Sequence, residues 1–237
     1  MSEEVLIGEK AQFTILCAGA LRRSVTDAAE AFHARDGVGV LIKLDTAGAV
    51  TKRASAGEVT DLLASSCDSL AALADKHLLG GEIITVGEAR MALGVRKGER
   101  APDISTMEKF TAVLRAAPVI VRGDPAGGGT GGIHLQAMFE KLGLIEETAA
   151  RTVLRIGGYN VMKEVAEGRA PFAMTQSTEI VPVPGVEIGA FIPDEVQLVT
   201  PYGLALGQGS NEAARAFLAF ATSHEARPFY EGAGFAV

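Results

Sequence analysis

The 237-residue sequence has little cysteine and no long uninterrupted apolar run. A membrane-spanning helix needs about 20 consecutive, mostly apolar residues. No stretch approaches that length, so we expect no membrane insertion. Cys17 and Cys67 stand in separate contexts and indicate free thiols rather than a disulfide framework. The four histidines show no CxxC or HxxxH spacing, so no metal site is expected.

The sequence also lacks an excess of basic residues. Its net charge of −7 and its isoelectric point near 5.2 argue against nucleic acid or an anionic membrane surface as a partner. The N-terminus is acidic and polar, without the basic start and apolar core of a secretory signal. We therefore expect a cytoplasmic protein. If the protein carries a signal peptide that this sequence lacks, the expectation becomes a periplasmic protein with a transporter permease as partner.

A glycine run from Gly123 to Gly132 is the most informative stretch that the sequence does contain. It follows the apolar segment 118–121 and precedes the amphipathic segment 133–142. A strand that passes through glycines into a helix presents free backbone N–H groups and the positive end of the helix dipole. Glycines also let a ligand approach the backbone closely. The run therefore predicts a site for a small anionic ligand.

This run lacks the features of a nucleotide-binding loop. The Walker pattern needs a lysine followed by Ser or Thr, and no lysine stands at 129–133. In a dinucleotide fingerprint an acidic residue would follow about twenty positions later, near Arg151, which is basic. No cofactor is expected.

Short apolar runs alternate with amphipathic helical patterns along the chain. The segments that read as strands are 13–18, 38–44, 61–64, 83–86, 90–95, 118–121, 152–156, 172–174 and 202–206. Leu21, Val25, Ala28 and Phe32 form one helical face, which Gly37 ends. The alternation predicts an α/β protein with mostly parallel sheets flanked by helices.

Two stretches, 84–93 and 196–203, are candidate crossovers between lobes. The prediction is two lobes, with residues 1–88 and 196–237 in lobe 1 and residues 89–195 inserted as lobe 2. In open α/β sheets ligands sit at the carboxyl ends of the strands. We therefore expect the lobes to face each other across a ligand-binding cleft and the glycine run to face that cleft.

Four local patterns resemble the molybdate-binding family of type II periplasmic solute-binding proteins. They are Leu16-Cys-Ala-Gly-Ala-Leu21, Ala56-Gly57 followed by Asp61-Leu-Leu-Ala64, Gly123-Asp-Pro125 with Gly131-Gly132, and the ending Phe229-Tyr-Glu-Gly-Ala-Gly-Phe235. Their order covers nearly the whole chain. The resemblance implies a two-lobe fold that closes on a small solute.

The resemblance also locates the ligand and shows where this chain departs from the family. Family members hold the oxyanion with hydroxyls from the first two turns and a tyrosine of the second lobe. Here Ala20 replaces the serine, Thr46 replaces a run of serines, and Gln176 replaces the tyrosine. Arginines 22 and 23 follow the first turn, and an arginine fork suits a carboxylate. The candidate ligand-binding residues are Ala20, Leu21, Arg22, Arg23, Thr46, Gly48, Gly129, Thr130, Gly131, Tyr159, Gln176 and Ser177.

Proton-transfer candidates are less defined. Tyr159 stands in a turn before a helix, His134 in the first turn of the helix after the glycine run, and Asp45 and Glu179 at strand ends. We take Tyr159, His134 and Asp45 as the candidate catalytic residues, although capping or structural roles also fit them. There is no GxSxG, so hydrolase chemistry has little support.

Two functions fit these observations. The first is a binding protein that closes on a small carboxylate or oxyanion. The second is a cytoplasmic isomerase of a small polycarboxylate on the same scaffold, because aconitate isomerases are similar to molybdate-binding proteins. Such an enzyme would act by allylic proton transfer. An effector-binding domain of a regulator is a weaker third interpretation.

Overall fold

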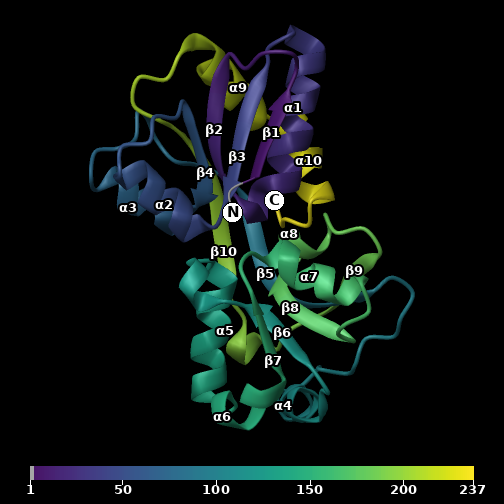
Figure 1. Ribbon diagram of the computed structural model, residues 1–237. Helices are drawn as coiled ribbons and strands as arrows, with labels where there is room; N and C mark the ends of the chain where they lie inside the picture. The colour runs from purple at the N-terminus through teal and green to yellow at the C-terminus, as the bar shows by residue number, and fades with distance from the viewer. Residues whose placement is uncertain (1–2) are drawn as a thin grey trace. The chain divides into compact units, whose positions relative to one another are not determined.

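In this computed structural model, which describes residues 3–237, the chain divides into two compact units. Unit 1 comprises Met1–Ala89 and Thr200–Val237, and unit 2 comprises Arg90–Val199. Unit 1 therefore contains both the purple N-terminal strands and the yellow C-terminal helices of Figure 1. The chain passes from one unit to the other within β5 (Ile84–Arg96) and at the start of β10 (Val199–Leu206).

Unit 1 is built on a five-stranded sheet in the order β1-β3-β2-β4-β10. Strands β2, β3 and β4 are parallel, while β1 and β10 are antiparallel to their neighbours. The strands are β1 (Glu3–Ile7), β2 (Phe13–Ala18), β3 (Val40–Asp45), β4 (Leu62–Ser66) and β10; the helices are α1 (Arg22–Asp36), α2 (Ala47–Ser55), α3 (Cys67–Ala74), α9 (Glu212–Ala221) and α10 (Arg227–Gly232).

Helix α1 confirms the predicted apolar face. Val25, Ala28 and Phe32 are buried, and the helix ends at Gly37 in the left-handed conformation (φ 70°) that favours glycine. The Phe32 ring meets Phe217 of α9 edge-on at 5.4 Å between centroids, and Phe217 also packs on Phe13 of β2 at 5.3 Å. These rings join the two ends of the sequence into one core.

Unit 2 also combines three parallel strands with antiparallel pairing. Its sheet pairs β7-β6-β8 in parallel, and β5 lies antiparallel between β8 and β9. The elements are α4 (Met107–Ala116), β6 (Ile120–Gly123), α5 (Thr130–Lys141), α6 (Ile145–Thr148), β7 (Thr152–Arg155), α7 (Gly158–Ala166), β8 (Phe172–Gln176), α8 (Ser177–Ile180) and β9 (Val186–Phe191).

Alternate side chains along the strands of unit 2 contribute to two hydrophobic cores. Ile120 of β6 joins the cluster under α4 and α5, whereas its neighbour Val121 joins the cluster under α7. Successive side chains of a strand point to opposite faces of the sheet. Helices α5 and α7 therefore cover opposite faces, as right-handed crossovers require when the chain steps from β6 outward to β7 and back to β8.

The α/β class with helix-flanked sheets is confirmed, and the structure refines three details. The sheets are mixed, each having three parallel strands and further strands paired antiparallel. The two strands expected at 83–86 and 90–95 are one continuous strand, β5, because the residues between them stay extended. The sequence analysis missed β1 and β9, whose charged or half-exposed residues lack a clear apolar alternation.

Candidate functional site

The carboxyl ends of the three parallel strands meet at one edge of the unit 1 sheet. Strands β2, β3 and β4 end at Ala18, Asp45 and Ser66, and α1, α2 and α3 begin within four residues of those ends. Helices α1 and α2 leave neighbouring strands toward opposite faces of the sheet, and the strand order reverses between β2 and β4, which makes the turns after these two strands the topological switch point. The predicted residues at 20–23 and 46–48 lie in the turns after β2 and β3 or in the first turns of α1 and α2.

Hydroxyl groups at this edge serve as helix caps. Thr46 Oγ1 accepts a hydrogen bond from Ala49 N at 3.2 Å, and Ser66 Oγ accepts one from Ser69 N at 3.4 Å. Ala20 and Leu21 are buried and begin α1 through a 3-10 turn (Gly19–Leu21). From these two residues only backbone groups could meet a ligand.

Both predicted arginines have carboxylate partners within the chain. Arg22 Nη1 and Nη2 donate to the two carboxylate oxygens of Glu3 on β1, at 2.6 and 2.7 Å. Arg23 Nε donates to Asp27 at 2.5 Å, one turn along α1, and its side chain is half exposed. A ligand carboxylate at Arg22 would therefore exchange with Glu3.

Both carboxylate oxygens of Asp45 accept hydrogen bonds from nearby residues. Its Oδ1 accepts from Thr46 N at 2.9 Å, and its Oδ2 accepts from Arg53 Nη1 at 3.2 Å. These bonds make it a turn carboxylate that neutralises Arg53 together with Glu58. Gly48 is the second residue of α2 and is partly exposed.

The glycine run opens the equivalent edge of unit 2. Asp124 Oδ1 accepts from Ala126 N at 2.9 Å, and Gly128 adopts φ 69°, a conformation that favours glycine. Helix α5 then starts at Thr130, earlier than the predicted start at Ile133. Thr130 is therefore the first residue of the helix and not its N-cap. Gly129 is the N-cap, and it has no side chain to bind the free N–H groups of α5.

Close approach explains why the run needs its glycines. A Cβ on Gly123 would lie 2.8 Å from Gly132 Cα, so β6 and the first turn of α5 pack backbone to backbone. A Cβ on Gly131 would lie 3.8 Å from Gln176 Cγ, which is ordinary contact. The structure thus brings Gly131 and Gln176 together at this edge. Ser177 follows and its Oγ accepts from Arg90 N at 3.4 Å.

His134 and Tyr159 lie on the helices of this edge. The His134 Nε2 atom lies 2.8 Å from the Val196 carbonyl oxygen, so that nitrogen donates a proton and cannot act as a base there. Tyr159 is the second residue of α7, and Lys163 Nζ lies 5.7 Å from its ring centroid. Of the two residues, Tyr159 stays the better proton-transfer candidate.

Glu179, which is outside the candidate set, is the carboxylate most closely built into this edge. It lies on α8, and its Oε1 accepts from Gly158 N, the first residue of α7, at 3.1 Å. Its Oε2 accepts from Thr175 Oγ1 at 2.5 Å. Burial raises the pKa of Glu179, although its hydrogen bonds act in the opposite direction. In the sequence, the only sign that Glu179 belongs to this edge was its position just after a predicted strand.

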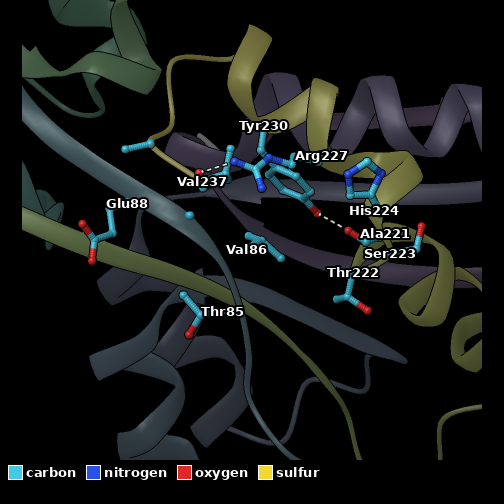
Figure 2. Close-up of a pocket in the computed structure, with 12 residues that line it drawn as sticks. Thr85, Val86, Glu88, Ala221, Thr222, Ser223, His224, Arg227, Tyr230 and Val237 are labelled. Atoms are coloured by element: carbon cyan, nitrogen blue, oxygen red, sulfur yellow. Dashed lines mark hydrogen bonds between the residues drawn. The ribbon is translucent and has the colours of Figure 1, made fainter.

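A separate cavity of about 560 Å³ lies in unit 1, between the start of β5 and the C-terminal segment (Figure 2). Tyr230 Oη donates to the Ala221 carbonyl oxygen at 2.9 Å, and Arg227 Nη2 donates to the Val237 carbonyl oxygen at 2.6 Å. The Thr222 hydroxyl likewise donates to a helix carbonyl. None of the predicted site residues lines the cavity.

Other features were also predicted from sequence. Cys17 and Cys67 are free thiols, as expected, and burial raises the pKa of Cys17 to about 12. Within residues 3–237, no group of three His, Cys, Asp or Glu side chains is placed to hold a metal ion. No helix in the same range is long and apolar enough to cross a membrane.

The chain has two α/β units, and in each unit the parallel strands lead into the N-termini of helices. This arrangement defines the class of type II solute-binding folds. The chain belongs to the family of bacterial extracellular solute-binding proteins, which it matches over residues 13–236. It is 29% identical over 234 residues to an aconitate isomerase of Pseudomonas sp, covering 93% of this chain and 86% of the relative.

Solved structures show the same fold. The periplasmic molybdate-binding protein of Azotobacter vinelandii aligns with a TM-score of 0.77 and 17% identity, covering 95% of this chain and 99% of the other. The sulfate-binding protein of Mycobacterium tuberculosis aligns with a TM-score of 0.74 and 17% identity, covering 95% and 86%. The resemblance inferred from four short motifs is confirmed by these matches.

Proposed function

We propose that this protein binds a small carboxylate or related anion through helix N-termini at the carboxyl edges of its sheets. The start of α5 is the main anion-binding element. One observation carries the proposal: α5 begins at a glycine N-cap, so no side chain of the N-cap residue binds the N–H groups of its first turn. The names of the molybdate- and sulfate-binding structures agree with an anionic ligand.

A carboxylate fits the donors better than a compact tetrahedral oxyanion. Ala20 offers no hydroxyl, and the Thr46 hydroxyl oxygen already accepts a hydrogen bond as a helix cap. Gln176 supplies an amide where molybdate binders of this family use a tyrosine hydroxyl. Losing two neutral donors should cost an enclosed oxyanion about 1–3 kcal/mol each. We therefore expect citrate-like or aconitate-like ligands to bind more tightly than molybdate.

The substitution Gly131→Ala tests the role of α5. Its new methyl group would meet Met91 Sδ at 3.4 Å and Gln176 Cγ at 3.8 Å, so the fold should tolerate it. The methyl would crowd the N–H groups that hold the anion. We expect about tenfold weaker binding of cis-aconitate by calorimetry, the equivalent of one charge-assisted hydrogen bond.

Gly232→Ala in α10 is the matched control, because no atom lies within 4 Å of the added Cβ. It should leave binding unchanged. Equal affinities of Gly131→Ala and the unaltered protein for cis-aconitate would contradict the assignment of α5. Submicromolar binding of molybdate would contradict the preference for a carboxylate.

A second candidate function is isomerisation of a small polycarboxylate, favoured by the 29% identity to an aconitate isomerase along nearly the whole chain. The reaction moves a proton between two carbons and shifts a double bond, with no oxidant or cofactor. Its positioning needs are those of carboxylate binding, plus one group that removes and returns the proton.

An exchange experiment separates the two functions. The protein is incubated with cis- or trans-aconitate in heavy water and followed by NMR. Appearance of the other isomer or of carbon-bound deuterium would establish an enzyme, and Tyr159→Phe should then lower turnover by about two to four orders of magnitude. Binding without exchange would leave the solute-binding function, with a transporter permease as the expected partner of an exported protein. A cytoplasmic location stays a prediction.

A further inference from the structure

The chain places one of its own carboxylates at the N-terminus of α7. Gly157, the N-cap of this helix, has no side chain. Instead, Glu179 reaches from α8 and accepts the Gly158 N–H at 3.1 Å. The backbone N–H of Gln176 and the hydroxyl of Thr175 also donate to it. A carboxylate thus occupies the position where the positive end of the α7 dipole would attract an anion.

The local sequence is shaped around this carboxylate. A Cβ on Gly158 would lie 2.0 Å from Glu179 Oε2 and 2.2 Å from Thr175 Oγ1. Any residue other than glycine would therefore displace the carboxylate from α7. Glu179 is held by three donors from two elements.

Helix α5 shares this edge of the sheet but differs in its start. Its N-cap is also a glycine, yet no side chain caps it. The two starts are linked through Gln176, which donates its N–H to Glu179 and lies in contact distance of Gly131. Of these two helix N-termini in unit 2, that of α7 is occupied by an internal carboxyl group and that of α5 is not.

We infer that Glu179 is a specificity-determining residue, whose charge closes the N-terminus of α7 to the ligand and directs the ligand's anionic group to α5. This inference rests on the proposed anion binding. The same charge repels the bound anion, and the repulsion grows with each negative charge on the ligand. Glu179 therefore lowers the affinity most for the ligands that carry the most negative charge.

Charged groups on the elements packed against Glu179 have other partners. On α7, Glu164 pairs with Arg155 and Arg169, and Lys163 lies over the Tyr159 ring. On β9, Glu187 accepts a hydrogen bond from Gly98 N. Strand β8 contributes no charged side chain. No charged neighbour contributes to the raised pKa of Glu179, so its own protonation controls the local charge.

The test is the substitution Glu179→Gln, which removes the charge and keeps the shape. We expect sulfate and cis-aconitate to bind about 3- to 30-fold more tightly at pH 8, with the larger gain for the more highly charged aconitate. The matched control is Glu167→Gln, at the C-terminal end of α7, where the carboxylate is exposed and paired with Arg169. It should change either affinity less than twofold.

Unchanged or weaker binding by a folded Glu179→Gln protein would overturn the inference while leaving anion binding intact. Loss of isomerase turnover without a change in affinity would also overturn it, because Glu179 would then be a proton-transfer group. Failure of both the unaltered protein and the variant to bind either probe would instead remove the proposed function, and the inference with it.

A second measurement covers the case in which Glu179→Gln does not fold. Burial raises the pKa of Glu179, so it takes up its proton at a higher pH than an exposed glutamate does, whereas sulfate keeps its charge between pH 8 and pH 5. The affinity for sulfate should therefore rise on acidification. The profile is measured in His134→Gln, which removes the imidazole one turn into α5. An affinity that does not rise in that variant overturns the inference.

Discussion

Glu164 shows how a single buried carboxylate stabilises unit 2. Only 8% of its side chain is exposed, and it accepts hydrogen bonds from Arg155 at 2.8 Å and Arg169 at 2.5 Å. Hydrogen bonding by Arg169 is the main cause that lowers the pKa of Glu164 to about 2, from an ordinary 4.5. A carboxylate whose pKa falls on folding stabilises the protein above its unfolded pKa, and this stabilisation disappears as the pH falls toward the folded value.

We therefore expect Glu164→Gln to lower the free energy of unfolding by about 1–3 kcal/mol at pH 7. We expect a value in the lower half of this range, because both arginines are about half exposed and water screens their charges. Urea unfolding from pH 7 to pH 2 measures this, and the difference from the unaltered protein should vanish near pH 2. A difference that does not depend on pH would mean that packing, not charge, is lost.

At the scale of elements, the junction between β8, α8 and α7 depends on one glycine. The start of α7 must approach Glu179 so closely that no Cβ fits at Gly158. Gly158→Ala should lower the free energy of unfolding by about 1–3 kcal/mol, the usual cost of overpacking. Thermal unfolding measures the loss.

The control for this substitution is again Gly232→Ala, where the added methyl meets open space. Replacing a helical glycine in this way should be neutral or slightly stabilising, since alanine loses less backbone entropy on folding. Equal melting temperatures for the two variants would show that α7 can shift away from Glu179 at no cost.

At the scale of the whole molecule, the two units differ in how the chain builds them. Unit 2 is continuous in sequence, whereas unit 1 needs both ends, because β10 pairs with β4 and Phe217 packs on Phe13. Residues 90–199 alone should therefore fold and unfold cooperatively. Residues 1–199 should lose the transition of unit 1, since the truncation exposes Phe13, Phe32 and an unpaired edge of β4.

Calorimetry and circular dichroism on the two fragments measure this prediction. A non-cooperative 90–199 fragment would show that unit 2 needs contacts beyond its own core. A native-like transition of unit 1 in residues 1–199 would show that β10 and α9 contribute less than their burial indicates.

Patterns among neighbouring residues were sufficient to predict the helices, most of the strands and the family. The apolar spacing of α1, the glycine run before α5 and the short motifs all depend on neighbouring residues, and their physics acts within one or two turns. The same local patterns predicted that the candidate residues stand just after strands. Strands β1 and β9 escaped detection because each is an edge strand, defined by pairing with a distant segment rather than by its own pattern.

Only the tertiary structure decided which side chains are already engaged. Arg22 and Glu3 are 19 positions apart, and Glu179 is 21 positions from Gly158, yet each pair forms hydrogen bonds. Hydrogen bonds and ion pairs depend on distances of a few ångströms, which sheet register and helix packing set between segments far apart in the chain. Sequence could therefore nominate Arg22, Asp45 and His134, but only the folded chain assigned partners to them and brought Glu179 to the start of α7.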